Sequence, residues 1–309
     1  MGPLPFLTSF RKRLSTAGIR FAITSGQACV YYGIQQTTKD SDWIVEPDDL
    51  EMLVELLVQI EVSDGFSVSH RAICGAPCSR DFLANGWTTH IQITDAENVV
   101  HHLDFFGKAP RVTVLERDTE DSDYASRLVV AQMKKTDREK DWPFVVALSH
   151  QAIIRGDVRG VLHGQDADWL IDTWRMVPVK QRETLVTQRP LLNLVDRNPN
   201  RLRRALAIEK HIWQSINRYR YRPYQIAWKE FFRQWRREPN FAWPPACSFH
   251  EQSQMLHSAA TKYKLPNAPL DESMRVAALL EARRDAIEIF EAADAELDQI
   301  VPPLEWMLP

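Results

Sequence analysis

The chain has 309 residues, of which 44% are hydrophobic and 26% are charged, and its formal net charge is −3. These values are typical of a globular protein with one large domain or two smaller ones, and the net charge does not indicate that the molecule as a whole binds polyanions. Four cysteines are too few and too scattered for a secreted disulfide framework, and no apolar run is long enough to cross a membrane. We therefore expect a cytoplasmic protein with free thiols, no zinc site at Cys74 and Cys78, and no membrane partner.

The first part of the chain alternates between helical and strand patterns. Short apolar runs bounded by turn residues indicate strands, and apolar residues spaced by three and four indicate helices. We expect helices at 6–18, 27–32 and 47–60, strands at 21–24, 42–45, 87–94, 99–106 and 111–115, and a hairpin turn at 95–98.

From Tyr124 onward the pattern is almost wholly helical. We expect helices at 124–135, 140–154, 165–175, 180–188, 200–219, 223–237, 250–264 and 271–299. The predicted fold class is therefore α+β, with a small mixed sheet and flanking helices followed by an all-helical C-terminal domain. We place the first domain at 1–155 and the second at 156–309, with the boundary somewhere within 115–160.

Two closely spaced carboxylates stand at the start of the strand predicted at 42–45. Because side chains alternate along a strand, Asp40 and Asp42 share one face and lie about 7 Å apart. Two such charges repel each other unless a positive group lies between them, and Mg²⁺ prefers oxygen ligands of this kind. The pair could also be a solvated turn.

A third carboxylate, Asp104, stands among Leu103, Phe105 and Phe106 in another predicted strand. An ionised Asp is costly to bury in apolar surroundings, so a metal site shared with Asp40 and Asp42 would explain it. The alternative is a structural ion pair with Lys108 or Arg111.

The Ser25-Gly26 turn joins a predicted strand to a predicted helix. Bare backbone amides at such a turn suit a phosphate, and glycine allows the ligand to approach the backbone closely. We therefore expect phosphate binding at this turn.

Together these motifs resemble the nucleotidyltransferases of the DNA polymerase β superfamily, and most closely the bacterial branch of abortive-infection toxins. The resemblance covers roughly residues 20–148. It rests on a glycine turn before a helix, an Asp-x-Asp motif, a distal Asp and a later basic group, matched here by Ser25-Gly26-Gln27-Ala28, Gly33, Thr38, Asp40-Ser41-Asp42, Asp104, Lys134, Arg138, Lys140 and Asp141.

The resemblance implies that Asp40, Asp42 and Asp104 bind two Mg²⁺ ions and that Asp104 helps to activate an acceptor hydroxyl. It further implies that an NTP such as ATP is held by Ser25, Gly26, Thr38, Lys134 and Arg138. Two positions depart from the branch pattern: Ser25 replaces the first glycine, and Gln36 stands where an arginine is expected. Lys134 and Arg138 could instead belong to a solvated helix face, and His101 and His102 receive no role.

The segment 197–237 contains twelve Lys or Arg, two acidic residues and eight aromatic residues. Basic residues attract phosphates and aromatic rings can stack on unpaired bases, so this segment is a candidate RNA-binding region. It could equally form a helix with an aromatic core face and an ordinary basic surface, or pair with the acidic helices at 48–55 and 281–298.

We therefore predict a metal-dependent nucleotidyltransferase that moves an NMP from an NTP to an acceptor hydroxyl and releases pyrophosphate. The acceptor expected first is RNA such as tRNA, and a protein or a small molecule is the alternative. The toxin-like branch also implies an antitoxin-like protein partner. The alternative, favoured by Gln36, is a catalytically silent module that binds RNA or a protein partner.

Overall fold

The computed structural model describes residues 3–309, and these form two compact units. The sheet unit contains the chain up to Ala109 together with Arg117–Ala125 and Pro223–Pro269. The helical unit contains Pro110–Glu116, Ser126–Arg222 and Leu270–Pro309. Each unit is thus assembled from separate stretches of chain, whereas the sequence suggested a single division after residue 155.

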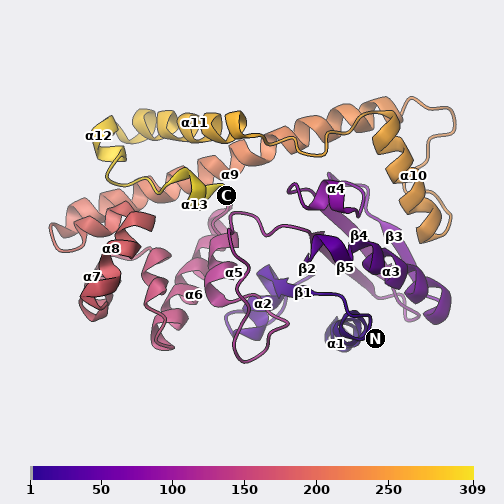
Figure 1. The fold of residues 1–309 in the computed structure, drawn as a ribbon, viewed down its shortest axis with the longest axis horizontal. Helices are drawn as coiled ribbons and strands as arrows, with labels where there is room; N and C mark the ends of the chain where they lie inside the picture. The colour runs from indigo at the N-terminus through magenta and orange to yellow at the C-terminus, as the bar shows by residue number, and fades with distance from the viewer. Residues whose placement is uncertain (1–2) are drawn as a thin grey trace. The chain divides into compact units, whose positions relative to one another are not determined.

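The sheet has five strands in the order β1-β2-β5-β4-β3 (Figure 1). Strands β2 and β5 are parallel and all other neighbours are antiparallel, so the predicted α+β class with a mixed sheet is confirmed. The bounds are β1 Phe21–Thr24, β2 Asp40–Val45, β3 Ser67–His70, β4 Thr88–Thr94 and β5 Val100–Phe106. Strand β3 was not predicted. The strand predicted at 111–115 is wrong, because Arg111 has a φ of 62°, which ends extended structure.

Helices of the sheet unit cover one face of this sheet. Phe10 packs edge-on against Trp43 at 5.2 Å between ring centroids and lies 6.4 Å from Phe105. This face is fully apolar at the centre, because Trp43, Leu103 and Phe105 are completely buried. The helices and 3-10 turn of the sheet unit, apart from part of α9, are α1 Pro3–Thr16, α2 Ser25–Tyr31, η1 Pro47–Asp49, α3 Leu50–Asp64, α4 Arg80–Leu83 and α10 Phe249–Lys262.

The opposite face of the sheet is polar and half-exposed. Burial alternates along β4 and β5, so that every second side chain avoids the core. The side chains turned away from the core at the centre of the sheet include Asp40, Asp42, His90, Gln92, His102 and Asp104. Alternation of this kind places an open polar surface behind a tightly packed apolar one.

The helical unit is built around buried charged side chains. Arg189 and Glu209 form a bidentate pair in which neither side chain is exposed, and Lys135 lies 4.4 Å from the ring centroids of Trp213 and Trp306. Its helices and 3-10 turns, apart from part of α9, are α5 Arg127–Met133, η2 Glu139–Asp141, α6 Trp142–Ile154, η3 Val158–Leu162, α7 Ala167–Met176, α8 Val179–Gln188, η4 Pro190–Leu194, α11 Glu272–Phe290, α12 Asp294–Leu297 and α13 Leu304–Met307.

Helix α9, Pro199–Trp235, is continuous through Pro223 (Figure 1). Separate helices at 200–219 and 223–237 were expected, because proline removes one backbone donor and crowds the preceding turn. The helix nevertheless continues, and its residues from Pro223 onward belong to the sheet unit. The helix predicted at 271–299 is also wrong in extent, since α11 stops at Phe290 before Glu291 with a φ of 50°. No helix within residues 3–309 is long and apolar enough for a membrane span.

Candidate functional site

The strand register places the predicted carboxylates side by side on the polar face of the sheet. Asp42 in β2 is the register partner of Asp104 in the parallel strand β5, and Asp104 is in turn the partner of His90 in β4. Asp40 stands two residues before Asp42 and opposite His102. Register partners on neighbouring strands point to the same face, so these side chains form one polar patch.

Two histidines and one arginine contact the carboxylates of this patch. His90 Nδ1 lies 2.7 Å from Asp104 Oδ1, and Arg71 Nη1 lies 3.5 Å from the same oxygen. His102 Nδ1 lies 3.2 Å from Asp40 Oδ1. The positive partner of Asp104 is therefore Arg71.

Arg111, considered as a partner for Asp104 in the sequence, has other contacts. Its guanidinium donates to the backbone oxygens of Gln132 and Met133 and to the side chain of Asn217, all within the helical unit. An ion pair between Asp104 and Arg111 is therefore not part of this structure.

The turn at Ser25-Gly26 begins directly beside the carboxylates, because Thr24 is the register partner of Asp42. Ser25 has a φ of 52°, a left-handed conformation that costs a non-glycine residue energy and is often found at functional sites. A Cβ at Gly26 would stand 2.5 Å from Thr38 Oγ1, so only glycine allows Thr38 to pack there. Gln35 Nε2 donates to the Gly26 carbonyl at 2.8 Å and fixes the turn from the other side.

The basic residues predicted for the nucleotide lie in the helical unit. Lys134 Nζ lies 3.6 Å from Asp141 Oδ1, and Arg138 Nη2 lies 2.7 Å from Asp141 Oδ2. Lys134 is buried and follows α5, while the Arg138 side chain is largely exposed. Both cations therefore have the same carboxylate partner, and the reading of Lys134 as a solvated residue does not apply.

The donor chemistry of the polar patch suits a hard divalent cation. Carboxylate oxygens from adjacent strands are the ligands that Mg²⁺ prefers, and Asp42 and Asp104 supply them from register-paired positions. Within residues 3–309, no group of three His, Cys, Asp or Glu side chains is arranged to hold a metal ion as it stands. The Asp104 carboxylate points to His90, so metal binding there would require it to turn about its side-chain bonds.

His90 and Arg71 were not identified from the sequence. The predicted hairpin would bring His90 near Asp104 but not opposite it: a turn at 95–98 pairs Thr94 with Val99, whereas the structure pairs Thr94 with Val100 and therefore His90 with Asp104. Arg71 could not be identified from the sequence, because it follows β3, a strand of four residues with only one aliphatic side chain that the sequence pattern does not predict.

The aromatic residues of segment 197–237 divide into core and surface. Trp213, Tyr224, Phe231 and Trp235 are buried, as expected of a core face. Trp228 and Phe232 are half-exposed and stacked, with ring centroids 4.8 Å apart and planes 12° apart. Within the sheet unit, both rings line a cavity of about 20 Å³ together with Arg71 and His90, the two residues that contact Asp104. The exposed basic residues on this part of α9 and just after it are Lys229, Arg233, Arg236 and Arg237.

Comparison with known proteins provides no identification. No family model matches the chain, and neither a curated protein nor a solved structure matches it.

Proposed function

We propose that the polar face of the sheet unit is the active site of a magnesium-dependent nucleotidyltransferase, which moves an NMP from an NTP to an acceptor hydroxyl. The observation that carries this proposal is the register of β2 against β5. This register brings Asp42 and Asp104 to neighbouring positions on one half-exposed face. Thr24 pairs with Asp42, so the Ser25-Gly26 turn, in which Ser25 has a left-handed backbone conformation, begins at the next residue. Within a folded domain, adjacent carboxylates on an open face favour cation binding over packing.

In this proposal Asp40, Asp42 and Asp104 would hold magnesium, which would neutralise charge on the triphosphate. The Ser25 hydroxyl and the backbone amides of the turn contact the phosphate oxygens, while Thr38 fixes the turn by packing on Gly26. Asp104, once its carboxylate has turned from its contact with His90 toward the metal, takes the proton of the acceptor hydroxyl. The acceptor oxygen forms the new bond to phosphorus as the bond to pyrophosphate breaks.

The proposed acceptor is the end of an RNA strand. Trp228 and Phe232 form a half-exposed stacked pair, and each is followed in α9 by an exposed basic residue, Lys229 and Arg233. Base stacking on aromatic rings contributes roughly 1–3 kcal/mol per base, and neighbouring cations attract the phosphates. Both rings line the same small cavity as Arg71 and His90, the residues that contact Asp104, so the stacked pair lies near the proposed site.

Radiolabelled NTPs, magnesium and a mixture of RNAs test the reaction directly. The wild-type protein is expected to transfer label to RNA and release pyrophosphate. Asp42→Asn and Asp104→Asn are expected to lose at least about a hundredfold in rate, because each removes a charge at the reacting centre. Asp81→Asn, at an exposed position on α4, is the matched control and is expected to retain activity.

Unchanged transfer in Asp42→Asn and Asp104→Asn would contradict the proposed site. Label on protein, or on a small hydroxylated molecule, would keep the reaction and replace the acceptor. For the RNA surface, the double variant Trp228→Ala/Phe232→Ala is expected to weaken RNA binding while NTP binding stays unchanged.

A second candidate is a catalytically silent module that binds RNA or a protein partner such as an antitoxin. The contact of Arg71 with Asp104 favours it, because an arginine beside the third carboxylate supplies the positive charge that a metal ion would otherwise provide. RNA binding by a folded protein that releases no pyrophosphate with any NTP would establish this alternative.

A further inference from the structure

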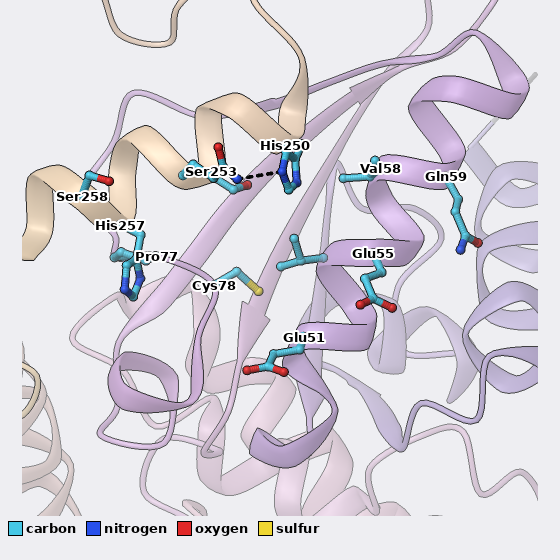
Figure 2. Close-up of a pocket in the computed structure, with 12 residues that line it drawn as sticks. Glu51, Glu55, Val58, Gln59, Pro77, Cys78, His250, Ser253, His257 and Ser258 are labelled. Atoms are coloured by element: carbon cyan, nitrogen blue, oxygen red, sulfur yellow. Dashed lines mark hydrogen bonds between the residues drawn. The ribbon is translucent and has the colours of Figure 1, made fainter.

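A separate groove lies in the sheet unit between helices α3 and α10 (Figure 2). Its volume is about 780 Å³, which is within the range of roughly 300–1,000 Å³ found for small-molecule sites. Glu51, Val54, Glu55 and Val58 form one wall, and their spacing places them on one face of α3. The other wall belongs to α10 and includes His250 and His257.

Hydrogen bonds connect the walls of the groove to each other and to the sheet. The Glu61 carboxylate near the end of α3 accepts a hydrogen bond of 2.9 Å from the backbone N–H of Phe249 at the start of α10. His70 of β3 holds α10 as well, because its N–H donates to Gln252 Oε1 at 3.1 Å and its ring lies 3.2 Å from Ser253 Oγ. The groove is therefore a preformed feature of the sheet unit, and a ligand would not have to open it.

Part of the groove lining is apolar and uncharged. Val54 and Val58 of the α3 wall are half-buried and Pro77 is buried, and all three contribute apolar carbons to the lining. The Cys78 sulfur points between the two helices (Figure 2). Burial raises the pKa of this thiol to about 12, and the thiol therefore stays neutral at physiological pH.

The α3 wall, in contrast, carries two exposed negative charges. Glu51 and Glu55 are four residues apart on one helical face, where like charges repel each other and destabilise a helix. Within residues 3–309, neither carboxylate has a hydrogen-bond or ion-pair partner. On the opposite wall, His250 already contacts Gln254 at 2.8 Å. A ligand that complements this groove would therefore carry a positive charge for Glu51 and Glu55 next to an apolar part.

From this arrangement we infer that the α3–α10 groove binds a small organic cation, an ammonium group on an aliphatic body. The ammonium group lies at Glu51 and Glu55, and the aliphatic part lies along Val54, Val58 and Cys78. The helices that form this site carry none of the residues proposed for nucleotidyl transfer. The inference therefore does not rest on the proposed enzymatic function.

Hexylamine and its neutral counterpart hexanol are suitable probes, compared by NMR titration of the full-length chain at low ionic strength. Hexylamine is expected to bind more tightly than hexanol, because only the amine supplies the missing charge. Glu51→Gln/Glu55→Gln is expected to weaken hexylamine binding by about tenfold and to leave hexanol unaffected, because it removes only the carboxylate charges. Val58→Phe fills the groove and is expected to weaken both ligands.

Glu288→Gln, an exposed charge change on α11, is the matched control and is expected to leave both affinities unchanged. Thermal unfolding of each variant establishes that it is folded, and the glutamine variants alter only exposed side chains. Equal binding of amine and alcohol, no binding of either, or unchanged hexylamine binding in Glu51→Gln/Glu55→Gln would each overturn the inference. An equal loss in Glu288→Gln would also overturn it, since the amine would then respond only to overall charge.

Discussion

Charged side chains are held in opposite ways in the two units. In the helical unit, Arg189 and Glu209 have no exposed surface, and the guanidinium also donates to the Val161 carbonyl at 2.6 Å. In the sheet unit, the Asp104 side chain is 16% exposed and its nearest guanidinium nitrogen lies 3.5 Å away. Loss of one member of a buried, hydrogen-bonded pair leaves an uncompensated charge and destabilises a fold, whereas a partly exposed carboxylate with a long ion-pair contact is available to a ligand.

The largest expected effect comes from breaking the buried pair. Arg189→Met leaves the Glu209 carboxylate buried without its cation, so we expect a loss of about 3–5 kcal/mol in the free energy of unfolding. Chemical denaturation measures it. Arg175→Met, in the exposed pair with Asp172, is the control and should have little effect. Similar losses in both variants would remove the distinction between the two kinds of pair.

Gly26→Ala tests the packing beside the carboxylate patch. The new Cβ would stand 2.5 Å from Thr38 Oγ1, and overpacking of this kind costs about 1–3 kcal/mol in unfolding free energy. The double variant Gly26→Ala/Thr38→Ala removes the clashing oxygen and should recover part of that loss. A purely additive double-mutant cycle would show that the two residues do not press on each other in solution.

Acid should weaken the sheet unit through His70. Burial lowers the pKa of His70 to about 3, while a free histidine titrates near pH 6.5. Between these values the unfolded chain binds more protons than the folded one, so the free energy of unfolding falls as the pH drops below about 6.5, by about 2 kcal/mol at pH 5. Urea denaturation across this range, with His70→Gln as the comparison, measures the effect. The variant should lose less stability in acid, and an identical acid response would exclude His70 as the cause.

The smallest stability effect is expected on the polar face itself. Asp104→Asn keeps the shape of the side chain and removes only its charge, so we expect a change of about 1 kcal/mol or less in unfolding free energy. Glu209→Gln makes the same kind of change inside the helical unit and should cost clearly more. A large loss in Asp104→Asn would mean that this carboxylate supports the fold, and the contrast between the units would disappear.

Much of the sheet could be predicted from local pattern. The runs at 21–24, 42–45, 87–94 and 99–106 combine apolar alternation with clear turn residues, and each corresponds to a strand. Strand β3 was not predicted, because Ser67-Val68-Ser69-His70 has one aliphatic side chain and forms a strand through its pairing with β4. Helix α9 continues through Pro223, where local preference predicted a break.

The candidate site shows a similar limit. Spacing within one strand was enough to place Asp40 and Asp42 on one face, and an apolar context was enough to single out Asp104. The contacts of Asp104 with His90 and Arg71 depend on strand order, which local patterns do not contain. The motif singled out Lys134 and Arg138 as nucleotide-binding cations. In the structure both contact the Asp141 carboxylate, which competes with a nucleotide for their charge.

The return of Pro223–Pro269 to the sheet unit has a practical consequence for dissecting the protein. Tyr224 donates to the Asn85 carbonyl, Trp87 donates to the Pro266 carbonyl, and Gln252 accepts from His70. A fragment that ends near residue 155 would lack the partners of Asn85, Trp87 and His70. It would also expose the apolar surface that now packs against α10. Such a fragment is therefore expected to aggregate, and the chemistry of the sheet should be assayed in a polypeptide that includes Pro223–Pro269.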